Sequence, residues 1–384
     1  MNPVRHSDCS VWRGSKITME KIVMSNGVNK KVICAMSGGV DSSVAAALLK
    51  KQGYDVIGLF LNMHQNFNSE DAEKVAKKLN IPLKILDVRK EFKKRVVDYL
   101  IREYKEGKTP NPCVECNRWI KFKFLMEKAM ALKADFIATG HYARLRREFP
   151  ISNFQFPIKL LKAKDKHKDQ SYFLWTLTQD WLRRILFPIG DYTKKEVKEM
   201  AKKWGLPIFG KRESQEICFV NTNLHKFLET RIHTKKGSII TVKGEKVGEH
   251  EGLAFYTIGQ RKGIGVGGIG PFYVVDKDFK NNTLIVAKSE YAPELYKKEM
   301  LVEKVNWTRL DSQRPALAQR ADARQGFRCR VKIRYLHSAV PATIFKIQNS
   351  RFKIKFDKKQ RAITPGQSAV FYKRSEILGG GVII

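Results

Sequence analysis

The sequence predicts an α/β domain with a parallel sheet covered by helices on both faces, then a small β-rich central domain and a C-terminal β-barrel. Three observations support this prediction. Between residues 31 and 140, continuous short apolar runs alternate with helical runs, as expected for strands buried on both faces. After about residue 222 glycines cluster, and after about residue 295 short β-type runs recur at regular spacing.

The first domain is expected over residues 31–221. Its predicted strands are residues 31–36, 55–61, 83–88 and 134–140. Its predicted helices are residues 42–53, 69–80, 91–107 and 120–133, and the residues at 109–117 between two of them are expected to form a loop. Ligands of such sheets bind at the carboxyl ends of the strands, so the loops at Ser37, near Asn62 and at Gly140-His141 are candidate sites.

The later elements are shorter. Two helical runs, residues 177–187 and 193–205, complete the first domain, and the central domain (222–295) contains the glycine-rich stretch 237–275 and a strand at 283–287. The barrel (296–384) is predicted from β-type runs at 327–335, 342–347, 352–356 and 368–373. Residues 1–30 have no clear periodicity and are interpreted as a loose basic extension, with Met19 and Met24 as alternative start sites.

Charge points to a polyanionic partner. The 384 residues contain 73 Lys plus Arg against 38 Asp plus Glu, a formal net charge of +35. Nucleic acid is the first candidate for such a surface, and a lysine-rich proteome is the alternative explanation. No signal peptide and no apolar run of membrane-spanning length is found in the sequence. A reducing cytoplasmic location is therefore expected, where the six cysteines are better explained by catalysis, redox chemistry or metal binding than by structural disulfides.

Residues 37–43 read SGGVDSS between a predicted strand and a predicted helix. Loop amides and serine hydroxyls at a helix N-terminus can surround a pyrophosphate, and Asp41 could hold Mg²⁺ against it. The Gly-Lys-Ser/Thr ending of a P-loop is missing, and an ordinary capped turn would have the same outline. The full motif resembles the PP-loop of the ATP pyrophosphatases, which implies adenylation of a substrate oxygen rather than γ-phosphoryl transfer.

Three cysteines stand out. Cys113 and Cys116 lie in TPNPCVECNRWIKF (109–122), where a nearby helix N-terminus and basic residues would favour a thiolate. Half of a zinc site is the alternative for Cys113 and Cys116, although no second Cys-x-x-Cys is present. Cys218 lies in ESQEICFV, and a buried structural cysteine in a strand is the alternative there.

Taken together, the motifs resemble one family, the tRNA-specific 2-thiouridylases. The similarity runs in family order from about residue 31 to the C-terminus. Its segments are MSGGVDSSV, GLFL, TPNPCVECNRWIKF, IATGHYARL, KDQSYFLW, FPIGDYTKKEV, ICF, GEHEGL, YTIGQRKG, YVVDKD, RYLH and TPGQSAVFY. The resemblance implies a PP-loop domain, a central β-rich domain and a tRNA-contacting barrel. It also implies ATP-dependent replacement of O2 by sulfur in the wobble uridine of tRNA anticodons.

Residue roles carry over with the resemblance. Cys116 matches the family nucleophile, and Cys218 matches the cysteine that carries a persulfide. The positions that would hold ATP are Ala35, Met36, Ser37, Gly38, Gly39, Val40, Asp41, Ser42, Leu61 and Gly140. The positions that would contact tRNA are Asn111, Pro112, Cys113, His141, Lys168, Asp169, Gln170, Arg334, Tyr335 and Gln367.

The implied mechanism is adenylation of the uridine C2 oxygen, with ATP and Mg²⁺ as cofactors. A cysteine desulfurase or a sulfur-relay protein would load Cys218, sulfur would displace AMP, and Cys116 would close a disulfide with Cys218 that must then be reduced. The target base must leave its stack to reach these groups.

Two positions depart from the family pattern. Leu61 replaces a common methionine at the adenine contact, a change that conserves volume. Cys113 replaces a common aspartate. Cys113 is therefore either a bystander or, with Cys116 and Cys218, a ligand of an iron–sulfur cluster that offers an open iron to hydrosulfide. The rival functions are another PP-loop tRNA-modifying enzyme and a non-catalytic RNA-binding module.

Overall fold

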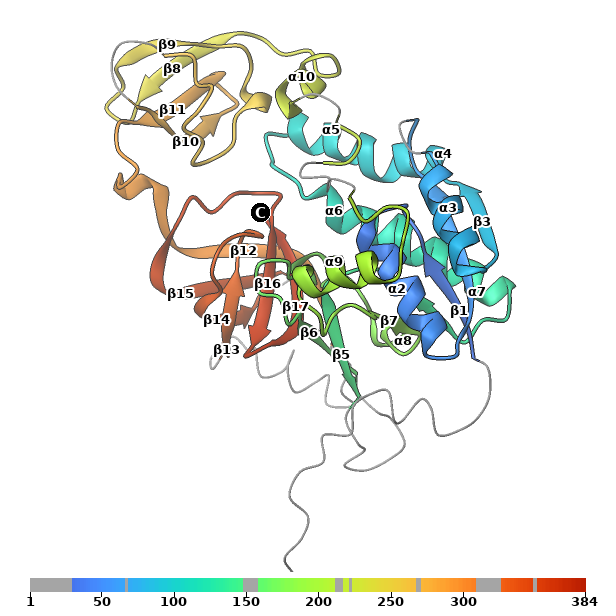
Figure 1. Cartoon of the computed structure of the whole chain (residues 1–384). Helices are drawn as coiled ribbons and strands as arrows, with labels where there is room; N and C mark the ends of the chain where they lie inside the picture. The colour runs from blue at the N-terminus through green and yellow to red at the C-terminus, as the bar shows by residue number, and fades with distance from the viewer. Residues whose placement is uncertain are drawn as a thin grey trace, which may run out of the picture.

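The structure is a computed structural model that describes residues 30–65, 68–147, 158–210, 217–220, 223–266, 271–308, 326–347 and 351–384. The predicted extension, with Cys9, lies outside the described residues apart from Lys30. Three bodies follow one another along the chain in Figure 1: the α/β domain in blue to green, the central sheet in yellow to orange, and the barrel in orange to red. No helix among the described residues is both long enough and apolar enough to span a bilayer.

The first domain is built on a five-stranded parallel sheet. Its strands are β1 (Lys31–Ala35), β2 (Asp55–Asn62), β3 (Leu83–Asp87), β4 (Phe136–Ala138) and β7 (Ile185–Leu186). They lie in the order β3-β2-β1-β4-β7, with all four neighbouring pairs parallel. The predicted α/β fold is therefore confirmed, and the chain changes direction across the sheet on either side of β1, which is where such sheets bind ligands.

Helices cover both faces of this sheet. On one face, α2 (Val40–Lys51), α3 (Glu70–Leu79) and α9 (Lys194–Lys203) pack against alternate strand residues such as Val32 and Phe60. The alternate strand residues that face the other side of the sheet, such as Ile33 and Leu59, pack against the helical segments from residues 89 to 131. The inner strands β1 and β2 thus bury both sides, which explains their apolar sequences, whereas Ile85 of the edge strand β3 is exposed.

The segment that contains the first two site cysteines is helical. The structure has α6 (Pro112–Glu115), the π-helical turn η3 (Cys116–Phe122) and α7 (Lys123–Ala131) in direct succession. Asn111 caps the start, where its side-chain oxygen accepts from the Cys113 N–H at 3.2 Å, and Pro112 occupies the first helical position. The predicted loop at 109–117 is therefore wrong after Asn111, because a helix cap and an N1 proline were interpreted as loop residues.

A second interrupted helix and two short elements complete this domain. The predicted helix at 91–107 is α4 (Arg89–Phe92), the π-helical turn η2 (Lys93–Val97) and α5 (Asp98–Lys105). The run at 177–187 forms only the short helix α8 (Gln179–Leu182) before it enters β7, whose two residues are buried in the sheet. The 3₁₀ turn η4 (Ser171–Leu174) precedes it.

The central domain contains a four-stranded sheet in the order β10-β11-β8-β9. Its strands are β8 (Gly237–Thr241), β9 (Lys246–His250), β10 (Tyr273–Asp278) and β11 (Thr283–Ala287), preceded by α10 (Leu224–Glu229) and interrupted by η5 (Leu253–Phe255). The pair β11–β8 is parallel and the other two pairs are antiparallel.

The C-terminal barrel closes through six strands, after the turn η6 (Pro293–Leu295). They are β12 (Tyr296–Trp307), β13 (Phe327–Lys332), β14 (Val340–Lys346), β15 (Phe352–Arg361), β16 (Ser368–Lys373) and β17 (Glu376–Ile383), and the β12–β17 pairing closes the ring. Strands β5 (Ala143–Arg147) and β6 (Ile158–Lys162) from the first domain extend the same sheet, because β6 pairs with β17. The predicted barrel is confirmed, and it is continuous with the α/β domain through these two strands.

All three domains meet at Thr109. Its N–H donates to the Pro365 carbonyl at 2.8 Å, and its carbonyl accepts from the Gln367 side chain at 2.7 Å, both in the barrel domain. Its hydroxyl lies 3.0 Å from the hydroxyl of Thr257 in the central domain. Thr109 precedes the cap residue Asn111 by two positions, so both β domains hold the start of the helix that contains Cys116.

Candidate active site

The SGGVDSS loop lies between β1 and α2 at the carboxyl edge of the sheet. Gly38 has φ +73°, and a Cβ there would lie 2.8 Å from the Asp71 Cβ, so this position requires glycine for both conformation and space. The Ser42 hydroxyl lies within hydrogen-bonding distance of the Ser37 N–H (3.2 Å) and of the Gly39 carbonyl (3.1 Å). These contacts hold the loop as a tight turn at the N-terminus of a twelve-residue helix. A phosphate group is favoured at that position.

Asp41, in the first turn of α2, is held by two residues from distant parts of the chain. The Lys194 ammonium lies 2.7 and 2.9 Å from its two carboxylate oxygens, and the Tyr142 hydroxyl donates to it at 2.8 Å. The Lys194 side chain is only 10% exposed, so the pair is shielded from water on the lysine side. A carboxylate and an ammonium beside the same loop are the groups needed to handle a Mg²⁺–pyrophosphate unit.

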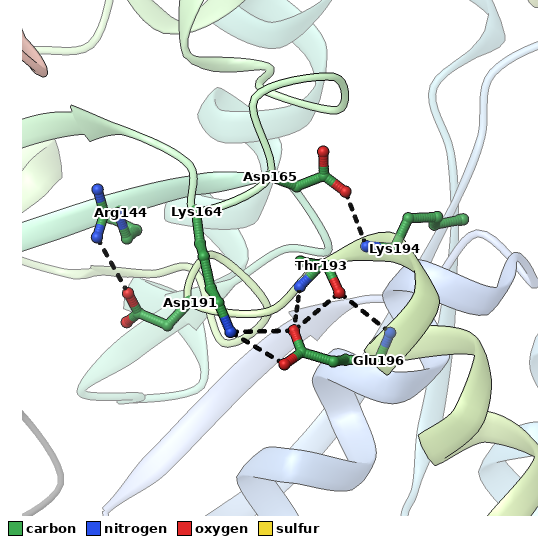
Figure 2. Close-up of polar contacts among 7 residues, drawn as sticks. All are labelled: Arg144, Lys164, Asp165, Asp191, Thr193, Lys194 and Glu196. Atoms are coloured by element: carbon green, nitrogen blue, oxygen red, sulfur yellow. Dashed lines mark hydrogen bonds and ion pairs between the residues drawn. The ribbon is translucent and has the colours of Figure 1, made fainter.

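The position of Lys194 follows from the start of α9 (Figure 2). Thr193 and Glu196 form a capping box, in which the Glu196 carboxylate accepts from the Thr193 N–H at 2.6 Å. These Thr193 hydrogen bonds, with the Lys164 ammonium at 3.0 Å, lower the pKa of Glu196 to about 2. Asp165 accepts from the Lys194 N–H at 2.9 Å. The cap therefore fixes the backbone from which Lys194 reaches Asp41.

The loop after β4 connects this nucleotide site to the thiol helix. A Cβ on Gly140 would lie 2.6 Å from the Ser42 nitrogen, so the two loops are in direct backbone contact. The next residue, His141, is buried, bonds to the Thr139 hydroxyl at 2.8 Å and stacks on Phe122 of η3 at 5.7 Å between ring centroids. Burial lowers the pKa of His141 well below its ordinary value, so this imidazole is neutral at pH 7.

Cys116, the first residue of η3, lies in a buried apolar environment. Its thiol is 4.0 Å from the Met63 sulfur, just beyond the end of β2. Burial raises the pKa of the Cys116 thiol to about 12. The predicted bias toward a thiolate is therefore wrong for this structure, since Cys116 lies one turn inside the helical segment and not at its N-terminus.

Cys218 and Cys113 are exposed, and neither forms a disulfide with Cys116. Cys218 lies in a turn at residues 217–220, which rules out the alternative of a buried strand cysteine. Desolvation by the surrounding chain raises the pKa of all three thiols, and the positive charge of Lys121 opposes that rise at each of them. One ammonium thus acts on three sulfur atoms. No cluster of three metal-ligating side chains is found among the described residues.

The residues expected to contact tRNA form the wall between the thiol helix and the barrel. Tyr335 packs on Phe173 at 4.5 Å between ring centroids, and the Phe173 carbonyl accepts from the Asn117 side chain at 3.3 Å, next to Cys116. Gln367 donates a hydrogen bond to the carbonyl of Thr109, which lies just before the N-terminal end of the same helical segment. The barrel is therefore linked to the thiol segment through Phe173 and through Thr109.

Several of these residues also bind the protein itself. Asp169 accepts from the Ala163 and Ser171 N–H groups at 3.1 and 3.2 Å and is buried. Gln170 accepts from the Tyr142 N–H at 2.9 Å, and Arg334 donates to the Ala362 carbonyl and, at 2.9 Å, to the Thr364 hydroxyl. Lys168 is half-buried in the same loop as Asp169. The loop at 168–170 thus supports Tyr142, which in turn holds Asp41.

Sequence reasoning assigned no role to Lys194, Tyr142 or Lys121. Each lies inside a segment that resembles the family, and Lys194 follows a capping signature, but their contacts to Asp41 and the thiols join positions far apart in the sequence. Of the residues expected at the nucleotide site, the loop 35–42 and Gly140 are in contact, and Leu61 is buried near the end of β2, the strand next to β1.

These features define a class of three-domain proteins in which a PP-loop-type turn lies beside a cysteine-containing helix. Three family models match in sequence: tRNA methyl transferase HUP domain over residues 30–222, tRNA methyl transferase PRC-barrel domain over 225–288, and Aminomethyltransferase beta-barrel domain over 297–383. The chain belongs to the tRNA-specific 2-thiouridylase MnmA family.

Similarity to curated members extends over nearly the whole chain. The tRNA-specific 2-thiouridylase MnmA of Clostridioides difficile is 42% identical over 373 residues, which cover 93% of this chain and 98% of that protein. The protein of the same name from Proteus mirabilis is 42% identical, covering 94% and 98%, and one from Geobacillus kaustophilus is 43% identical, covering 92% and 95%.

Proposed function

We propose that this protein replaces the C2 oxygen of the wobble uridine in tRNA anticodons with sulfur, using ATP. The observation that carries the proposal is the direct contact between the two halves of the site: Gly140 packs on the SGGVDSS loop while His141 packs on the helix of Cys116. A substrate oxygen placed between them would be within reach of both a bound nucleotide and a thiol. The net charge of +35 and the names of the relatives support tRNA as the substrate.

The nucleotide half prepares the leaving group. Residues 35–42, with Leu61 and Gly140, would hold ATP, and Asp41 and Lys194 would share Mg²⁺ and the phosphate charge between them. Bound ATP supplies the adenylyl group that converts the uridine oxygen into a good leaving group. Lys194 and Tyr142 hold the Asp41 carboxylate in place beside the loop.

The thiol half supplies sulfur. Cys218 is exposed, as a residue that must accept sulfur from a desulfurase or relay protein should be, and it would carry the transferable sulfur as a persulfide. The terminal sulfur attacks C2 and AMP leaves with the oxygen. The Cys116 thiolate then attacks the Cys218 sulfur, releasing the 2-thiouridine and forming a Cys116–Cys218 disulfide that an external thiol reduces. Lys121 is the cation near both sulfur atoms.

The test is direct nucleoside analysis. Purified protein is incubated with unmodified tRNA, ATP, Mg²⁺ and a persulfide donor, and the digested tRNA is examined by mass spectrometry for 2-thiouridine. We expect product with the wild type and none with Cys218→Ser or Asp41→Asn, while Asp41→Asn still binds tRNA. Release of pyrophosphate without thiolation would indicate another PP-loop tRNA-modifying enzyme. Binding of tRNA without pyrophosphate release would indicate an RNA-binding module.

The same preparation decides between the disulfide and iron–sulfur mechanisms. With oxygen excluded, we expect colourless, iron-free protein, and Cys113→Ser is expected to retain thiolation because Cys113 is exposed and outside the proposed pair. Stoichiometric iron that is lost together with activity in Cys113→Ser would replace the disulfide mechanism with the cluster mechanism.

A further inference from the structure

A cavity of about 890 Å³ opens at the carboxyl edge of the sheet, beyond the ends of β2 and β3. Its walls come from α4, η2, the turn at 217–220 and α10. The lining residues are Met63, His64, Gln65, Asp87, Arg89, Lys90, Glu91, Phe92, Lys93, Val97, Phe219, Phe227 and Arg231. No residue of the SGGVDSS loop lines it. The volume lies in the range of small-molecule sites and is large enough for a nucleotide.

A continuous row of rings forms one wall. Phe92 contacts Phe219 at 5.4 Å between ring centroids, and Phe219 contacts Phe227 at 5.6 Å, both edge to face. The guanidinium of Arg231 lies 4.0 Å from the Phe227 ring centroid. Flat aromatic and guanidinium surfaces of this kind are the surfaces on which unpaired bases stack.

Positive charge exceeds negative charge around the same space. Arg89, Lys90, Lys93 and Arg231 line it together with Asp87 and Glu91, and Lys93 is paired with Asp98 at 2.8 Å. Asp87 is already bound to Arg89 at 2.6 Å, whereas Lys90 makes no hydrogen bond or ion pair within the described part of the chain. The Lys90 ammonium acts on Asp87 only through its charge, without a hydrogen bond, so beside these stacking surfaces it can also meet a phosphodiester.

The cavity adjoins both reactive thiols. Two of its lining residues show this. Phe219 directly follows Cys218 in the sequence, and the Met63 sulfur lies 4.0 Å from the Cys116 sulfur. A group held in the cavity would therefore lie next to Cys218 and Cys116, where the target base must react.

We infer that this cavity binds one unstacked nucleotide of the RNA substrate, the direct neighbour of the uridine that is modified. The inference rests on the proposed function and adds a second recognition point to it. The base stacks on the Phe227–Arg231 surface, and its phosphate meets Lys90. Holding the neighbour out of the stack also holds the target uridine out, so that its C2 faces the thiols.

The experiment is a double-mutant cycle between protein and RNA. A stem-loop RNA with the target uridine is compared with versions that are abasic at the position on its 5′ or 3′ side, using wild type, Phe227→Leu and Arg231→Met. Loss of one stacked base weakens binding about 5- to 100-fold. We expect that loss on one side of the target only, a similar loss for each protein variant, and less than about twofold further loss when the two changes are combined.

Controls separate the alternatives. Phe227→Leu keeps an apolar side chain in the core. Arg231→Met changes an exposed side chain and removes its hydrogen bonds to the Phe227 carbonyl (3.0 Å) and the Thr230 hydroxyl (2.7 Å). Phe209→Leu changes an exposed ring outside the cavity and should bind every RNA normally. Additive losses would overturn the inference, as would a loss of ATP affinity with unchanged RNA binding, or slower loading of Cys218 by a persulfide donor with unchanged RNA binding. A wild-type protein that binds no stem-loop RNA would instead overturn the proposed function, and this inference with it.

Discussion

The resting protein should protect Cys116 from alkylation far more strongly than its place in the reaction suggests. Burial raises the pKa of this thiol from a reference value of 9.0 to about 12. At pH 8 the thiolate fraction is then about 10⁻⁴, against about 10⁻¹ for a thiol at the reference value. Because the thiolate is the reactive form, this lower population alone slows alkylation about a thousandfold, which the higher nucleophilicity of the more basic thiolate offsets in part. Burial of the sulfur slows the reaction further.

The assay is alkylation with iodoacetamide between pH 7 and 10, without ATP or RNA, followed by peptide mass spectrometry of each cysteine. The exposed thiols of Cys218 and Cys113 should react first, and Cys116 should react as slowly as Cys329, a buried barrel thiol whose pKa is also raised to about 12. The logarithm of the Cys116 rate should still be rising with pH at 10, and unfolding in urea should equalise the rates.

Alkylation of Cys116 at pH 8 within tenfold of Cys218 would refute this reasoning. It would mean that the helix opens in the resting state or that a cation stabilises the thiolate more than burial opposes it. If the prediction holds, Cys116 becomes a nucleophile only after RNA or ATP rearranges its surroundings.

Three further outcomes are expected. Gly140→Ala should weaken ATP binding about tenfold or more, because its Cβ would lie 2.6 Å from the Ser42 backbone nitrogen. The control Gly210→Ala, whose Cβ would have nothing within 4 Å, should bind ATP normally. Equal ATP affinities of the two variants would contradict this prediction. Lys121→Met should slow alkylation of Cys218 at pH 8 by removing the cation that lowers its pKa, and an unchanged rate would mean the charge is screened. Lys168→Gln should reduce the slope of log affinity for tRNA against log salt concentration by about one. If the affinity of the wild type does not depend on salt, the net charge reflects a lysine-rich proteome and not tRNA binding.

Local pattern was enough to predict four of the five strands of the α/β sheet, and the two-residue strand β7 was interpreted as part of a helical run. The run at 31–36 and the helix after Ser42 were predicted because continuous apolar residues and a stop at Gly53 identify a buried strand and a helix end. Strand β17 was not predicted, because GGG argues against a strand. In the barrel these glycines let other groups approach closely, and a Cβ on Gly380 would lie 2.7 Å from the Trp175 ring.

The candidate site was predicted where a motif is contiguous and missed where it is assembled in space. The order of residues 37–42 was sufficient to expect a phosphate-binding turn. Nothing local to Asp41 indicates that Lys194 and Tyr142 hold it, since those residues lie 153 and 101 positions away. The sequence predicts a lowered pKa for the Cys116 thiol, whereas burial raises that pKa to about 12. Basic residues nearby in the sequence do not indicate whether a thiol is buried.

The junction at Thr109 bears on how this chain can be divided. Its backbone and hydroxyl are held by Pro365 and Gln367 from one β domain and by Thr257 from the other. A fragment that ends before the barrel would lose the anchor that sets where the cysteine helix begins, together with the strand that pairs with β6. The position of this helix therefore depends on residues spread over more than 250 positions of sequence. Both β domains therefore take part in positioning the cysteine helix.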